Sequence, residues 1–117
     1  MTVEKLTEEM HLSVFCLSAP KALISGAYCG DLLSWVMGRA EENNAWLTIM
    51  SNQNVAAVAV MTDLSCIILT EGVTPDPALL DRCEKEGLNI LGTQLPTFEA
   101  AARLSEILGR EQDTIAW

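Results

Sequence analysis

The chain has 117 residues, of which half are hydrophobic and a fifth are charged, and 7 Lys and Arg against 16 Asp and Glu give a formal net charge of −9. This length predicts one domain, and the composition is that of a globular rather than a disordered chain. The acidic balance argues against binding to nucleic acid or to an anionic membrane surface, because both need Lys and Arg at the interface.

The N-terminal sequence bears on the compartment. The first ten residues carry three glutamates, whereas a secretory signal needs a basic start followed by an apolar stretch. The longest apolar run, Val55–Met61, is far shorter than the ~20 residues that span a bilayer. We therefore expect a cytoplasmic protein.

The first half of the chain predicts two helices and three strands. Residues 2–10 have helical periodicity, residues 12–17 read as a strand, and Pro20 ends it before a second short strand over 22–24. Small residues then predict a loop over 26–30. Asp31 is the expected N-cap of the next helix, and residues 46–50 form the third expected strand.

The second half repeats a strand and a helix. Val55–Met61 fits either, and we favour a helix because the runs at 46–50 and 66–69 look like parallel neighbours that need a crossover. Asp76-Pro77 opens the next helix and Gly87 closes it. A strand over 88–91 and a helix from Pro96 to about residue 108, closed by Gly109, complete the order. We expect one domain over 1–109 and a tail over 110–117.

The alternation of strands and helices predicts an α/β fold, a three-layer sandwich with a mainly parallel sheet. Ligands of such sheets bind outside the carboxyl ends of the strands, where the turns 25–31, 51–54, 70–72 and 92–97 are expected to meet. Free N–H groups at helix ends there suit a carboxylate or a phosphate, although Asp31 and Asp76 compete for them. Caps and turns of any α/β protein look similar. The candidate ligand-binding residues are Gly26, Asp31, Ser34, Asn52, Asn54, Thr70, Glu71 and Thr93.

The sequence shows no catalytic constellation. Gly26 and Gly30 are not followed by the Gly-Lys-Ser/Thr of a phosphate-binding loop, and no Gly-x-Ser-x-Gly elbow is present. The lone histidine, His11, begins a strand beside an acidic helix, where a solvated side chain is the simplest interpretation. The sequence identifies no cofactor.

Four cysteines contain no Cys-x-x-Cys pair, so the spacing predicts no metal site. Cys16, Cys66 and Cys83 lie in apolar stretches and are expected to be buried. Cys29 precedes a helix, and a helix N-terminus can lower the pKa of a thiol. A small enzyme with Cys29 as its nucleophile is therefore a third hypothesis, ranked last because no base is visible.

Two features indicate association. Val55–Met61 is apolar on every side, and Trp35 lies off the apolar stripe of its helix. A second subunit often covers such a helix, so we expect a homodimer, with a cover from the N-terminal segment as the alternative.

Several segments together resemble the DRTGG-domain family. The most specific reads GAYCGDLLSWVM over residues 26–37, and the likeness extends through WLTI at 46–49, NVAAVA at 54–59, IILTEG at 67–72, Pro75-Asp76 and TFE at 97–99. The sequence departs from the eponymous motif, since Ser25-Gly26-Ala27 stands where Thr-Gly-Gly is typical and Pro20-Lys21 is the nearest equivalent of Asp-Arg.

The resemblance implies a Rossmann-like domain similar to the N-terminal domain of HPr kinase/phosphorylase and to a module of phosphotransacetylases. There the module accompanies the catalytic domain, and stand-alone members are often encoded near iron-only hydrogenases. We therefore expect a non-catalytic regulatory or ligand-sensing module for a small anionic or nucleotide ligand, associated with a hydrogenase or with acetyl-phosphate metabolism. The alternative is a structural accessory subunit of a redox enzyme.

Overall fold

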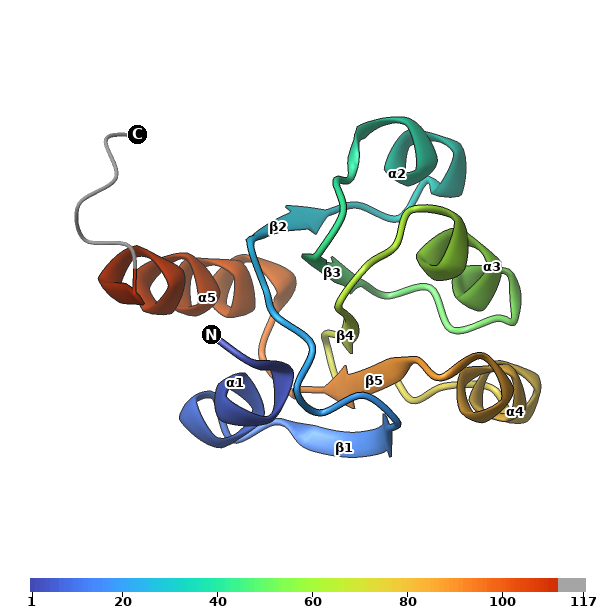
Figure 1. Ribbon diagram of the computed structural model, residues 1–117, viewed down its shortest axis with the longest axis horizontal. Coiled ribbons are helices and arrows are strands. Elements are labelled where there is room, and N and C mark those ends of the chain that lie inside the picture. The colour runs from blue at the N-terminus through green and yellow to red at the C-terminus, as the bar shows by residue number, and fades with distance from the viewer. Residues whose placement is uncertain (112–117) are drawn as a thin grey trace.

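A five-stranded sheet lies between two layers of helices in the computed structural model, which describes residues 1–111 (Figure 1). Helices flank every strand of the parallel part, as the alternating sequence pattern predicts. In chain order the elements are α1 (Val3–Glu9), β1 (Ser13–Leu17), β2 (Gly26–Cys29), α2 (Leu33–Arg39), β3 (Asn44–Thr48), α3 (Asn54–Met61), β4 (Cys66–Leu69), α4 (Pro77–Glu86), β5 (Asn89–Gly92) and α5 (Thr97–Glu111).

The strand order across the sheet is β1-β5-β4-β3-β2. Strands β2 to β5 run parallel, and β1 pairs antiparallel with β5. Register is continuous through the centre, where Trp46 lies opposite Ile67 and Ile67 lies opposite Ile90. The predicted three-layer α/β sandwich with a mainly parallel sheet is confirmed.

Both faces of the sheet are packed, so β3, β4 and β5 are buried at every position and their side chains are mostly apolar. On one face α1 and α5 cover alternate residues such as Leu47 and Ile68. On the other face α2, α3 and α4 cover the residues between them, including Trp46 and Ile67. The described helices include none long and apolar enough to cross a membrane.

The prediction for the second strand was wrong. Residues 26–29, expected as a loop, form β2, whereas 22–24 contribute an isolated bridge between Thr2 and Leu23. Small residues have low strand propensity, but pairing with β3 and the packing of Tyr28 against the core outweigh it. The third strand is Asn44–Thr48, two residues earlier than expected.

Several predicted helix ends also differ. The residue before α2 is Leu32, so Asp31 is not its N-cap. Helix α5 continues through Gly109 to Glu111, and the rest of the expected tail, 112–117, lies outside the described residues. Asp76 does precede α4, and Gly87 ends that helix with a left-handed φ of 70°. Residues 55–61 do form most of a helix, but Met61 is 71% exposed.

Candidate functional site

The carboxyl ends of β2 to β5 meet at one edge of the sheet, hereafter the carboxyl edge. The chain leaves the core there in four short loops that begin after the last residue of each parallel strand. In an open parallel sheet this is where ligands bind. Among the polar residues of the carboxyl edge are Asp31, Thr48, Asn52, Thr70, Glu71, Thr93 and Thr97.

Asp31 is fixed in place by the end of β3. The Thr48 hydroxyl donates to Asp31 Oδ1 at 2.7 Å, and the Ile49 N–H donates to the same oxygen at 2.9 Å. Thr48 is fully buried, so it binds the carboxylate from the side of the core. Both bonds fall on one oxygen, which leaves Asp31 Oδ2 available to a ligand on an exposed side chain.

Glu71 is held in a similar way by the start of α5. Its Oε2 accepts the Thr97 N–H at 2.8 Å, and this bond caps the helix. The hydroxyls of Thr70 and Thr97 share a hydrogen bond of 2.6 Å beneath it. Glu71 has a φ of 60°, a conformation that non-glycine residues rarely adopt. The other carboxylate oxygen, Oε1, stays available at the surface.

The loop before α3 closes on itself. Asn52 Oδ1 accepts the Asn54 N–H at 2.9 Å, and the Ser51 hydroxyl donates to Asp76 Oδ1 at 3.2 Å. The first bond satisfies an N–H group at the start of α3 in the way that an ordinary cap does, whereas the second joins this loop to the residue before α4. Thr93 has a comparable local role, since its hydroxyl accepts the Leu95 N–H.

The charge of the carboxyl edge is negative. Its loops carry Asp31, Glu71 and Asp76, and residues 30–32, 49–53, 70–76 and 93–96 contain no Lys or Arg. The N–H groups of Asn54 and Thr97, which could have received an anion, are already bonded to side chains. A phosphate would meet negative charge here, whereas a hydroxyl or amino group would find carboxylate oxygens that accept its hydrogen bonds.

Three of the eight candidate residues lie outside the carboxyl-edge loops. Gly26 begins β2 and is therefore at the opposite end of the strand from the carboxyl edge. Ser34 is exposed on α2, three residues after Asp31, and Asn54 is the first residue of α3. Thr48 and Thr97 were not among the sequence candidates. Thr48 ends the apolar run of β3, and Thr97 follows Pro96 at the start of α5. These positions are the sequence signals from which the two residues could have been predicted.

Cys29 ends β2 with an exposed side chain, but its chemistry is not that of an activated thiol. Partial burial, together with the nearby negative charge of Asp31, raises the pKa of Cys29 above its ordinary value of 9.0. This direction is opposite to the one that the hypothesis of a Cys29 nucleophile needs. Cys16, Cys66 and Cys83 are buried, as predicted, and burial raises the pKa of Cys66 to about 12.

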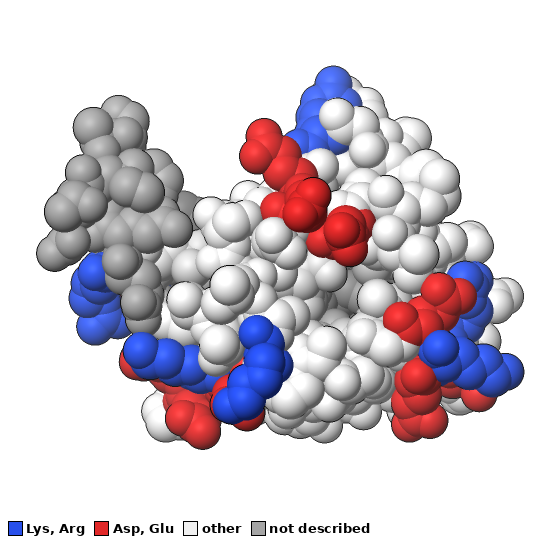
Figure 2. All heavy atoms as spheres, viewed as in Figure 1, with Lys and Arg blue, Asp and Glu red and all other residues white. Residues whose placement is uncertain are grey.

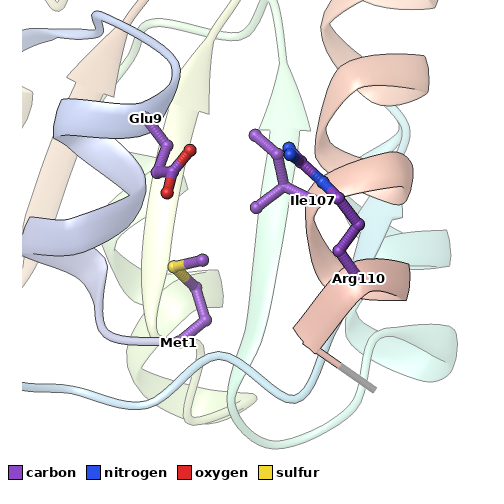
Figure 3. A pocket seen from close by; sticks show the side chains of 4 residues that line it. All are labelled: Met1, Glu9, Ile107 and Arg110. Carbon is purple, nitrogen blue, oxygen red and sulfur yellow. The ribbon is translucent and has the colours of Figure 1, made fainter. Parts of the chain in front are cut away.

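Two hollows lie on the α5 side of the sheet. One of about 290 Å³ separates α1 from α5, with Glu9 and Met1 on one side and Ile107 and Arg110 on the other (Figure 3). The other, of about 270 Å³, runs between β2 and α5, and we name it the β2–α5 groove. Among its lining residues are Ser25, Ala27, Cys29, Leu47, Ser105 and Leu108. Within residues 1–111 no group of His, Cys, Asp and Glu is suited to hold a metal ion.

Comparison with known proteins gives partial relatives. A 46-residue stretch is 48% identical to a phosphate acetyltransferase of Acinetobacter baylyi, covering 37% of this chain and 6% of that protein. The fold matches the crystal structure of the CBS and DRTGG domains of the regulatory region of Clostridium perfringens pyrophosphatase, complexed with the activator diadenosine tetraphosphate. That likeness has a TM-score of 0.67 at 12% identity and covers 86% of this chain and 44% of the other.

The chain thus spans a small part of the acetyltransferase and less than half of the pyrophosphatase region. The DRTGG domain family itself matches residues 29–107, which include everything from the end of β2 to the last turns of α5. This chain belongs to the DRTGG domain family.

Proposed function

We propose that this chain is a non-catalytic regulatory module that senses a small ligand at the carboxyl edge. The observation that carries the proposal is the pair of anchored carboxylates. Asp31 and Glu71 are each held through one oxygen by groups of the fold, and each has its second oxygen free at the surface. Such fixed acceptors recognise ligands with little loss of side-chain freedom on binding.

The ligand that fits best carries hydrogen-bond donors together with a flat apolar part. A nucleotide has ribose hydroxyls and base amino groups that can donate to the two carboxylates. Phe98 is 83% exposed directly after Thr97 and offers a ring on which a base can stack. The phosphates of such a ligand would point away from Asp31 and Glu71, into solvent. The pyrophosphatase region of similar fold is complexed with a dinucleotide, which supports this choice of ligand class.

The test is a thermal-shift titration with adenosine monophosphate, diadenosine tetraphosphate and acetyl phosphate. We expect the adenine nucleotides to raise Tm and acetyl phosphate, which lacks donors for the carboxylates, to leave it unchanged. Asp31→Asn keeps an oxygen for Thr48 and Ile49 but replaces the free oxygen with an amide nitrogen, so the nucleotide shift should fall. Asp63→Asn is the matched control, because Asp63 is exposed at the far end of α3 and asparagine tolerates its φ of 56°.

Two results would contradict the proposal. One is the absence of a shift with either nucleotide at saturation. The other is a shift of equal size in Asp31→Asn and Asp63→Asn, which would place the ligand elsewhere.

A second candidate function is that of an accessory subunit, either of a hydrogenase or other redox enzyme, or of an enzyme of acetyl-phosphate metabolism. Exposed large apolar side chains on the neighbouring helices α2 and α3 favour it: Trp35, Met37, Val60 and Met61. We propose that this surface mediates self-association into a homodimer. Light scattering at dilute concentration tests that part, and a monomer near 12.7 kDa would exclude it.

A further inference from the structure

Strand β2 forms one edge of the sheet (Figure 1). The Ser25 N–H donates to the carbonyl of Asn43, the residue before β3. Because successive N–H and C=O groups of a strand point to opposite sides, those of Gly26 and Tyr28 point away from β3. Within residues 1–111 no strand pairs with this outer side of β2.

This edge is short, but it lacks the charges and prolines that commonly block pairing. Residues 22–30 contain no charged residue and no proline, in a chain whose net charge is −9. The opposite edge differs, because the pairing of β1 with β5 is irregular between Val14 and Cys16. Natural proteins block open edges with charges, prolines or bulges, so an edge without them is suited to receive another strand.

The β2–α5 groove lies beside this edge and adds a place for side chains. Its wall on β2 consists of the small residues Ala27 and Cys29, and Leu47 and Leu108 supply apolar surface from the sheet and from α5. In a strand added to β2, every second side chain would point into this groove of about 270 Å³. A strand edge next to a groove that takes alternate side chains is a known arrangement for peptide recognition.

The charges at the two ends of β2 indicate the kind of occupant. Glu41 and Glu42 lie at the Ser25 end, where the Ser25 hydroxyl donates to the Glu42 carbonyl at 3.1 Å, and Asp31 lies at the Cys29 end. Figure 2 shows acidic side chains gathered on the visible face near the end of α2. An antiparallel second copy would bring Asp31 of one molecule towards Glu42 of the other, which is repulsive.

We infer that the outer edge of β2 receives an extended segment of a partner protein, with apolar residues at alternate positions and Lys or Arg on both flanks. The backbone of the segment would pair with Gly26 and Tyr28, and its apolar side chains would fill the β2–α5 groove. The flanking cations would meet Glu41 and Glu42 at one end and Asp31 at the other. This surface shares Asp31 with the proposed ligand site, but Gly26 and Tyr28 belong only to the docking surface and Glu71 only to the ligand site.

The experiment uses the whole chain and two synthetic hexapeptides, acetyl-Arg-Val-Thr-Val-Thr-Arg-amide and its analogue with Glu in place of both Arg. We expect the Arg peptide to bind about 10-fold more tightly in an NMR titration, since a few exposed charge pairs together contribute about 1.4 kcal/mol. Amide shifts should centre on Gly26 and Tyr28. N-methylation of alternate peptide bonds should abolish binding, because it removes the donors that pair with β2.

Two variants of α5 make the test specific. Ser105 lines the groove and is exposed, so Ser105→Phe should block peptide binding, whereas Ala102→Phe, at an exposed position of the same helix outside the groove, should not. As a measurement on the unaltered chain, the Arg peptide should slow the reaction of Cys29 with N-ethylmaleimide. Cys16, Cys66 and Cys83 are buried and serve as unreactive internal references.

Three outcomes would overturn the inference. The first is that neither peptide binds at millimolar concentration and Cys29 is not protected. The second is that binding survives both Ser105→Phe and N-methylation. The third is that the free protein forms a dimer that Ser105→Phe dissociates. The last result would assign the β2 edge to a second copy of this chain.

Discussion

The strained backbone of Glu71 leads to a prediction in which glycine is better than alanine. Glu71 combines a left-handed φ of 60° with a side chain that caps α5 through the Thr97 N–H at 2.8 Å. Glu71→Ala removes the cap and keeps a Cβ in the left-handed conformation. Glu71→Gly removes the same cap but relieves the backbone, because glycine populates positive φ without a steric penalty.

The magnitudes follow from the two effects. Loss of a helix cap costs about 1 kcal/mol, so Glu71→Ala should lower the free energy of unfolding by about 1–2 kcal/mol. A residue with a Cβ in the left-handed region costs about 1 kcal/mol more than glycine, so Glu71→Gly should lie about 1 kcal/mol above Glu71→Ala. For a chain of this size that difference corresponds to about 4 °C in Tm.

Urea unfolding of the wild type and both variants measures the effect, with Glu71→Gln as a control that retains an oxygen for Thr97. An alanine variant equal to or more stable than the glycine variant would refute the argument about backbone strain. Variants that both match the wild type would show that the bond to Thr97 contributes nothing to stability.

Three more predictions follow from buried or shielded groups. The pKa of Cys66 is raised to about 12, so the unfolded chain loses this proton at a lower pH than the folded chain does. Between pH 9 and 12 the free energy of unfolding should therefore fall more steeply in the wild type than in Cys66→Ala, by roughly 1 kcal/mol per pH unit. Parallel pH profiles of the two proteins from urea unfolding would contradict this. The buried Asn89 side chain accepts the Ala19 N–H at 2.9 Å and donates to the carbonyls of Ala19 and Ser65 at 2.8 and 2.9 Å. Asn89→Ala should therefore lower the free energy of unfolding, measured in urea, by about 3 kcal/mol. A loss below about 1 kcal/mol would mean that water replaces the side chain. Because its pKa is raised, Cys29 should react with a disulfide reagent at pH 7 no faster than free cysteine does, and the rate should increase with pH. A faster reaction at pH 7 would restore Cys29 as a candidate nucleophile.

The part of the fold that sequence reasoning predicted well rests on strong local signals. The apolar run at Cys66–Leu69, the Asp76-Pro77 start and the left-handed Gly87 each define an element within a few residues of chain. The assignment of Val55–Met61 as a helix needed a topological argument, and it held because parallel strands require a crossover.

The elements that were mispredicted depend on distant partners. Nothing local marks Gly26–Cys29 as a strand, since it is a strand because β3 pairs with it. Aspartate is a residue type that often caps helices, but Oδ1 of Asp31 accepts the hydroxyl of Thr48, which follows 17 positions later in the chain. The general rule for parallel sheets placed Asp31 and Glu71 at the correct edge, but neither the commitment of one oxygen in each nor the buried Thr48 beneath is visible in the sequence.

The antiparallel strand β1 has a consequence for synthesis on the ribosome. Strand β1 precedes the other four strands in the chain, yet its neighbour in the sheet is the last of them, β5, which ends at Gly92. Leu17 and Asn89, which pair at one end of this ladder, are 72 positions apart. Strand β1 therefore has no strand partner until more than 70 further residues have been translated. The nascent chain can assemble the parallel strands in order, but β1 can complete the sheet only after β5 has been made, so this edge of the fold forms last.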